Sequence, residues 1–279
     1  MMRNLSATYR RHGRIAAMRI PLFHVDAFTD RAFSGNPAAV CLLDRWLDDE
    51  WLRKVAAENN LSATAFLVPR GDRYDLRWFT PLCEVRLCGH ATLAAGYIVF
   101  ECLQPAKDTV LFETRFGGTL TVRRNETLLS MDFPAFVPKL CSTPPTALFE
   151  ALGATPAEMF EANDTYIAVF EDSGAIENLQ PNLELLKRLH PFAVAITAPD
   201  NVADFASRYF APSYGVPEDP VTGSLHCVLA PYWSGRLGKS RMHARQFSER
   251  GGELWCEVSG DRVILQGNAV LTMRGTLSL

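Results

Sequence analysis

The sequence predicts an α+β fold of two pseudo-symmetric halves, each a mostly antiparallel sheet rolled around a central apolar helix, with an active-site cleft between them. Two observations predict this fold. Each half contains one helical run that is almost entirely apolar, and a helix without a polar face is normally buried on every side. The halves also align as an internal repeat in which these two helices are equivalent.

The first half is predicted to consist mainly of strands, separated by Gly, Asn, Asp or Pro. The strands cover residues 19–28, 38–43, 64–68, 73–79, 109–114 and 118–133. Two helices interrupt them. The helix over 48–59 opens with Asp48 and Asp49, which suit a first helical turn. The helix over 91–101 is rich in Ala, Leu, Ile and Val, and we expect it to run through the middle of the sheet.

The second half has the same character. Strands are predicted near residues 165–170, 192–198, 242–247, 254–258 and 261–273, with an apolar helix near 223–233. Pro138, Pro144 and Pro145 indicate a boundary between the halves. We therefore divide the chain into a leader or extension over residues 1–17, a first half over 18–137 and a second half over 138–279.

The repeat places Gly89 and His90 over Gly223 and Ser224, each pair at the start of an apolar helix. The same number of positions separates Gly89 from the pair Gly117-Gly118 and Gly223 from the pair Gly251-Gly252. Helix N-termini present unpaired N–H groups and a partial positive charge, and glycine lets a ligand approach the backbone closely. Two such ends that face one cleft are expected to hold a small carboxylate.

Composition excludes several classes of partner. The chain has 28 basic and 31 acidic residues and a formal net charge of −3, which predicts neither a nucleic-acid nor an acidic-membrane partner. No run approaches the roughly 18 consecutive apolar residues of a membrane span, and a cytoplasmic location is expected. Residues 1–20 are rich in Arg and lack acidic residues, as in a transit peptide, but show no clear amphipathic stripe. We interpret residues 1–17 as a leader or an upstream-start extension.

The cysteines predict no metal site. There are seven, an odd number, and no pair has C-x-x-C spacing. Free thiols in a reducing cytoplasm are the simplest interpretation. His226 and Cys227 are adjacent, and neighbours on a helix point about 100° apart and rarely share a metal.

A set of motifs between residues 25 and 224 resembles the phenazine-biosynthesis PhzF-like family. They are Val25-Asp26-Ala27-Phe28 with Gly35-Asn36-Pro37, Asn60-Leu61-Ser62, Phe79-Thr80-Pro81, Cys88-Gly89-His90-Ala91-Thr92 and Glu218-Asp219-Pro220-Val221-Thr222-Gly223-Ser224. The resemblance implies a diaminopimelate-epimerase-like fold and a cofactor-independent isomerase. It also implies a homodimer. No Walker loop or Gly-x-Gly-x-x-Gly fingerprint indicates a nucleotide cofactor, and no flavin or metal is expected.

One position departs from the family pattern. Where the family has Ser-Glu-Thr, with a glutamate that shuttles a proton, this chain has Ser62-Ala63-Thr64. A methyl group can neither take nor give a proton. Three explanations compete: a deliberate Glu-to-Ala change, a natural paralogue with altered chemistry, or a natural non-catalytic binder.

The other candidate site residues are carried over from the resemblance, each with a structural alternative. His90 is expected to donate to a substrate carboxylate or carbonyl, or else it caps its own helix. Asp219 is expected to bind a substrate amine or relay a proton, or else it caps the turn before Thr222. The predicted substrate-binding residues are Asn36, Ser62, Gly89, Gly223 and Ser224, although Gly-Asn-Pro is also a common turn and Ser224 also suits a cap.

The expected function is a proton-shift isomerase for a small carboxylated substrate, amino-acid-like or dihydroanthranilate-like, impaired because Ala63 replaces the family glutamate. One alternative is a non-catalytic carboxylate-binding protein. Another is an epimerase that uses Cys88 as its only thiol, because the repeat aligns Cys88 with Thr222, which does not ionise in the useful range. A buried, inert cysteine is the commoner role for such a residue.

Overall fold

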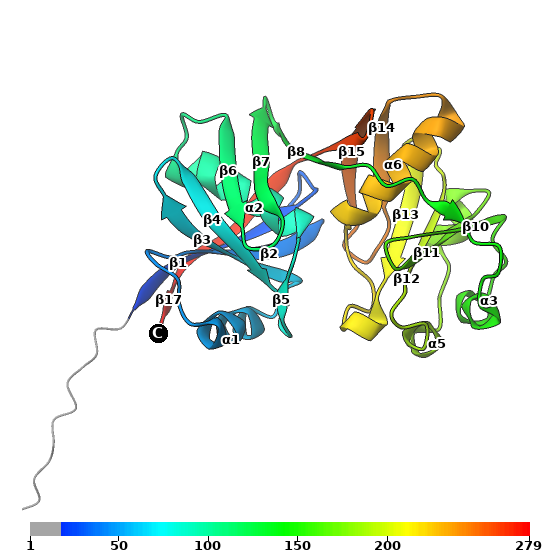
Figure 1. Ribbon diagram of the computed structural model, residues 1–279, viewed down its shortest axis with the longest axis horizontal. Helices are drawn as coiled ribbons and strands as arrows, with labels where there is room; N and C mark the ends of the chain where they lie inside the picture. Colours follow the sequence, from blue (N-terminus) through cyan, green and yellow to red (C-terminus); the bar gives the residue numbers. More distant parts are fainter. Residues whose placement is uncertain (1–17) are drawn as a thin grey trace, which may run out of the picture.

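The computed structural model describes residues 18–279, so the predicted leader over 1–17 lies outside the described residues. Figure 1 shows two lobes side by side. The first lobe contains β1 (Arg19–Ala27), β2 (Asn36–Leu42), α1 (Asp49–Asn59), β3 (Ala63–Arg70), β4 (Arg73–Phe79), β5 (Glu84–Val85), α2 (Gly89–Ile98), the π-helical turn η1 (Val99–Leu103), β6 (Thr109–Thr114), β7 (Gly118–Asn125), β8 (Leu128–Pro134) and the last strand, β17 (Ala269–Ser278).

The second lobe is built from the intervening chain. It contains β9 (Lys139–Leu140), α3 (Thr146–Leu152), β10 (Glu158–Ala162), β11 (Thr165–Val169), α4 (Ser173–Glu177), α5 (Leu183–Lys187), β12 (Ala193–Pro199), β13 (Phe205–Phe210), the 3-10 turn η2 (Pro212–Tyr214), α6 (Gly223–Leu237), β14 (Arg241–Gln246), β15 (Gly252–Ser259) and β16 (Arg262–Gly267). The mixed α+β class predicted from the sequence is confirmed, and most strand pairs in both lobes are antiparallel.

Two strands join the lobes. β8 pairs with β7 of the first lobe and with β16 of the second. After β16 the chain crosses back, and β17 pairs along the whole length of β1 (Figure 1). The division at residues 137 and 138 remains a prediction. The strand pairing shows that the end of the range 138–279 completes the first lobe.

Helix α2 is the core of the first lobe. It contacts β1, β2, β3, β7, β8 and β17, and nearly all of its residues are buried, as the apolar sequence predicts. Small residues allow the sheet to approach the helix closely. A methyl group added at Gly96 would lie 2.7 Å from a side-chain carbon of Val122, so this position has no room for a larger residue.

Two predicted strands are wrong in extent. The run over 118–133 is split into β7 and β8 by a tight turn at Glu126, whose φ is 54°. The run over 261–273 is split into β16 and β17 where the chain changes lobe. Polar and glycine residues interrupt the apolar alternation at both turns, over 123–127 and 266–268, and such residues are ordinary turn signals that the prediction did not use. Within residues 18–279, no helix has the length and apolar character needed to cross a bilayer.

Candidate active site between the lobes

A cavity of about 830 Å³ lies between the two lobes. Its walls come from segments far apart in the sequence: the start of α2, strands β7 and β8, the end of β13 and the start of α6. Six of the predicted site residues line it, namely Ser62, Gly89, His90, Asp219, Gly223 and Ser224. Two others, Ala63 and Asn36, do not.

The starts of α2 and α6 meet at this cavity. A methyl group added at Gly89 would lie 3.7 Å from the Cα of Gly223. The preceding residues, Cys88 and Thr222, both have extended backbone and neither caps its helix with its side chain. The expected convergence of two helix N-termini on one cavity is confirmed. Unpaired N–H groups from two helices therefore face a common space, which favours a bound anion.

Ala63 lies beside the cavity but faces the core. It is the first residue of β3, pairs with Ala38 of β2 and is 1% exposed. Its methyl group belongs to the main apolar cluster, together with Ala91 of α2. The residue before it, Ser62, lines the cavity. Position 63 thus supplies no ionisable group in this chain.

Asn36 supports the site from outside the cavity. Its side chain is completely buried and does not line the cavity, and its predicted contact with substrate stays a prediction. The Asn36 amide donates to Asp219 Oδ1 (2.8 Å) and to the carbonyl of Val221 (2.8 Å). A residue of β2 therefore orients the carboxyl of Asp219, which lies in the other lobe.

Gln246, the last residue of β14, belongs to the site although no sequence motif indicates it. Gln246 is 1% exposed. Its Oε1 accepts a hydrogen bond from the N–H of Thr222 (2.8 Å), and its Nε2 donates to the carbonyl of Asp219 (2.8 Å) and to Thr222 Oγ1 (3.1 Å). These bonds hold the turn before α6. No local motif marks Gln246, because its partners lie more than twenty residues away.

Burial is the main cause of the pKa shifts of the ionisable side chains in the cavity. Burial lowers the pKa of His90 to about 4, so its ring is neutral at pH 7. The pKa of the Cys88 thiol is raised to about 12, mainly by burial and to a smaller degree by the charge of Asp219, against a backbone hydrogen bond from Ala91 that lowers it. The pKa of Asp219 is raised to about 6 by burial, against the hydrogen bonds from Thr222 and Asn36 that stabilise its charged form. At pH 7 this cluster contains a thiol, a neutral imidazole and a carboxylate.

Asp219 is expected to titrate near pH 6 in the native protein. Carbon-13 NMR of the labelled carboxyl group measures this directly. Replacing Thr222 with Val removes the 2.6 Å hydrogen bond from Thr222 Oγ1 to Asp219 Oδ2, and we expect the pKa to rise further, by about one unit. An unchanged or lower pKa in Thr222→Val would contradict the assigned hydrogen bond.

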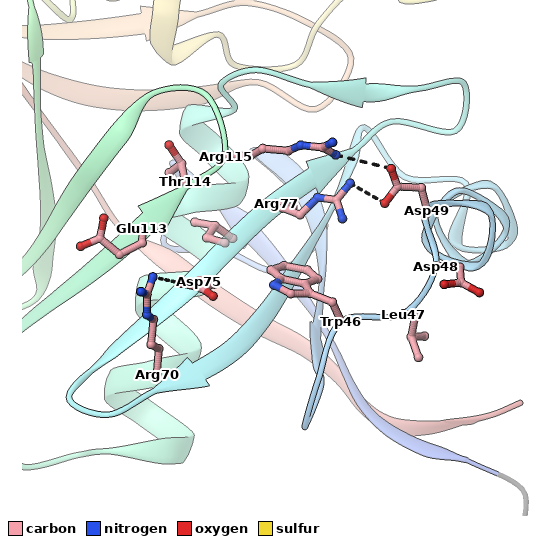
Figure 2. A pocket seen from close by; sticks show the side chains of 11 residues that line it. Trp46, Leu47, Asp48, Asp49, Arg70, Asp75, Arg77, Glu113, Thr114 and Arg115 are labelled. Carbon is pink, nitrogen blue, oxygen red and sulfur yellow. Dashed lines mark hydrogen bonds and ion pairs between the residues drawn. The ribbon is translucent and has the colours of Figure 1, made fainter.

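A second pocket, of about 700 Å³, lies on the first lobe and contains none of the predicted site residues. Figure 2 shows its arginine side chains paired with aspartates. Arg77 contacts Asp49 (2.8 Å), Arg115 contacts Asp49 (3.4 Å), and Arg70 contacts Asp75 (3.3 Å). We interpret this pocket as a solvated ion-pair network.

The chain matches a known protein family over most of its length. The family model described as phenazine biosynthesis-like protein matches residues 25–275. The chain belongs to the PhzC-PhzF family. A Pseudomonas aeruginosa relative described as an uncharacterized isomerase is 52% identical over 94% of this chain and 100% of its own length.

Solved structures agree with this membership. A PhzF-family protein from Enterococcus faecalis is 40% identical, has a TM-score of 0.90 and is matched over 94% of this chain and 100% of its own. A hydroxyproline epimerase from Agrobacterium vitis is 11% identical, with a TM-score of 0.60 over 94% of this chain and 93% of its own. The second likeness shows that this PhzF-family chain shares an epimerase fold.

Proposed function

We propose that this chain is an isomerase-type protein that binds a small carboxylated substrate, amino-acid-like or dihydroanthranilate-like, in the cavity between the lobes. The proposed reaction is a cofactor-independent proton shift, impaired because Ala63 replaces the family glutamate. The observation that carries the proposal is the contact between the two helix starts at Gly89 and Gly223, with His90 and Asp219 lining the same cavity. Family membership and the isomerase name of the relative support it.

Each group has a role in the proposed reaction. The substrate carboxylate lies against the N–H groups of the two helix starts, which stabilise negative charge as a neighbouring C–H ionises. His90 is neutral at pH 7 and can donate a hydrogen bond to a carboxylate or carbonyl oxygen. Asp219 is ionised at pH 7 and can bind a substrate ammonium group or accept a proton.

Two residues, Ala63 and Cys88, bear on the alternative functions. Ala63 favours a non-catalytic carboxylate binder, since it leaves the cavity without the family's proton shuttle. The one-thiol epimerase loses support, because a Cys88 thiol with a pKa of about 12 is protonated at pH 7 and the thiolate is the reactive form. The homodimer and the cytoplasmic location stay predictions.

Binding of matched ligands tests the pocket itself. Isothermal titration calorimetry at pH 7 is expected to show that a cyclic amino acid binds at least about tenfold more tightly than its carboxamide, because two helix N-termini favour the anion. The carboxamide has the same skeleton and size, so it controls for shape. Equal affinities for acid and amide would remove the support for an anion site between the helix starts.

A further inference from the structure

The cavity has a second polar feature, an ion pair away from His90 and Asp219. Arg262, at the start of β16, and Asp132, on β8, both line the cavity. Arg262 Nε donates to Asp132 Oδ1 at 2.9 Å. Among the described residues, the terminal nitrogens of Arg262 and the second oxygen of Asp132 make no hydrogen bond to protein. The pair therefore offers donors and an acceptor side by side.

The position of this pair relative to α6 indicates how long a ligand must be to reach from the start of the helix to Arg262. The backbone N–H of Phe136 donates to the carbonyl of Cys227 (3.0 Å), and the N–H of Ala135 donates to the carbonyl of Asp261 (2.8 Å), so the start of β16 lies close to Cys227. Cys227 is four residues after Gly223 on the same helix and also lines the cavity. Four residues advance about 6 Å along a helix. A ligand whose carboxylate lies at the start of α6 thus needs a rigid body of about one helical turn to reach Arg262.

The wall of the cavity is mostly apolar. The apolar residues that line it are Leu87, Leu120, Phe133, Phe136 and Pro134, the last residue of β8. Apolar walls with a few convergent polar groups are typical of sites that bind a small organic molecule in one orientation. A flat or cyclic hydrocarbon body fits this wall better than a chain with polar groups throughout.

The charges of Arg262 and Asp132 determine which chemical group suits the distal end of the ligand, that is, the end away from its carboxylate. A second carboxylate would gain from Arg262 but would be repelled by Asp132, and an ammonium group would meet the opposite balance. A neutral group that both donates and accepts, such as a carboxamide or hydroxyl, suits both members at once.

We propose that Asp132 and Arg262 select substrates with a neutral, hydrogen-bonding group about one helical turn from the carboxylate, across an apolar ring. This proposal rests on the proposed function, because it takes the carboxylate position from the helix starts. It adds a specificity contact that the sequence motifs do not indicate. Neither residue belongs to the reacting cluster, so both are assigned to substrate selection.

Para-substituted benzoates test the proposal by calorimetry, because a rigid ring holds the two groups apart. The native chain is expected to bind 4-carbamoylbenzoate about tenfold more tightly than 4-methylbenzoate, which keeps the ring and the carboxylate but has an apolar methyl group in place of the carbamoyl group. In Arg262→Met the two affinities should become equal, through loss of the carbamoyl ligand alone. The control is Arg241→Met, which breaks an exposed ion pair with Glu257 in the same lobe and should change neither affinity.

A charge-switch variant makes the test sharper. In Asp132→Asn the repulsion of a second carboxylate is removed while Arg262 remains, so terephthalate should bind at least about tenfold more tightly than it binds the native chain. Equal binding of 4-methylbenzoate and 4-carbamoylbenzoate to the native chain would overturn the specificity contact and leave the carboxylate pocket standing. If the native chain bound terephthalate more tightly than either of the other two benzoates, the preference for a neutral distal group would be overturned. Failure of every benzoate to bind would overturn both the pocket and the contact.

Discussion

Ala63→Glu is expected to raise the rate of solvent-deuterium incorporation into a carboxylated substrate by at least about 100-fold, because positioned acid–base groups contribute about 10²- to 10⁴-fold. The chain with Ala63 has no ionisable group at this position, and Ser62, the residue before it, already lines the cavity. Incorporation into a panel of cyclic amino acids and anthranilate-like acids, followed by mass spectrometry, measures the effect. We expect the chain with Ala63 to show little or no exchange while it still binds ligand.

The matched control is Ala63→Gln, which has the size of Glu but cannot carry a proton. Because Ala63 is 1% exposed, both variants crowd the core, and their thermal unfolding should show similar destabilisation. Exchange in the Glu variant but not in the Gln variant would therefore result from proton transfer by the carboxylate and not from the change in packing. Adding Cys88→Ser to Ala63→Glu should leave the exchange in place, whereas its loss would revive the thiol mechanism. If Ala63→Glu folds and binds ligand but gives no exchange, the non-catalytic binder becomes the better account.

Gly35→Ala is expected to lower the free energy of unfolding by about 3 kcal/mol or more. Gly35 has a φ of 65°, and a side chain there costs about 1–2 kcal/mol by backbone strain alone. An added Cβ would also lie 2.2 Å from the carbonyl oxygen of Ala27 and 2.8 Å from Thr29, and overpacking of this kind costs about 1–3 kcal/mol more. Urea unfolding at pH 7 measures the loss.

The same position is coupled to the site. Gly35 precedes Asn36, whose amide supports the Asp219 carboxylate, so a displaced backbone at Gly35 should also raise the pKa of Asp219 above about 6. The control is Gly71→Ala, which has the same φ of 65° with no atom within 4 Å of the added carbon. Gly71→Ala should lower the free energy of unfolding by the backbone strain alone, about 1–2 kcal/mol. Equal losses in the two variants would show that the contact with Ala27 does not limit this turn.

The conformations of the two helix starts could be predicted because their signals are local. Apolar residues all round a helix indicate burial, and a glycine at each helix start indicates close approach of backbone or ligand. The repeat then aligned Cys88 with Thr222, and the structure places both immediately before their helices. The pseudo-two-fold relation between the halves stays a prediction.

The roles of Asn36 and Gln246 could not be predicted, because their partners are distant in sequence. Asn36 lies 183 residues from Asp219, and nothing in Gly-Asn-Pro indicates which group the amide will meet. Gln246 ends an alternating strand and resembles any polar strand residue until β14 is placed beside α6. The pairing of β17 with β1 is likewise a long-range contact, which periodicity does not specify.

By itself the sequence determined the family, the α+β class, the two buried helices and the absence of a carboxylate at position 63. Each follows from residue identity or short-range pattern, which a chain carries before it folds. Only the tertiary structure decided that Asn36 faces Asp219, that Gln246 holds the turn before α6, and that Asp132 and Arg262 share the cavity with His90. These depend on which strands pair across the lobes, and that choice is made by packing between distant segments.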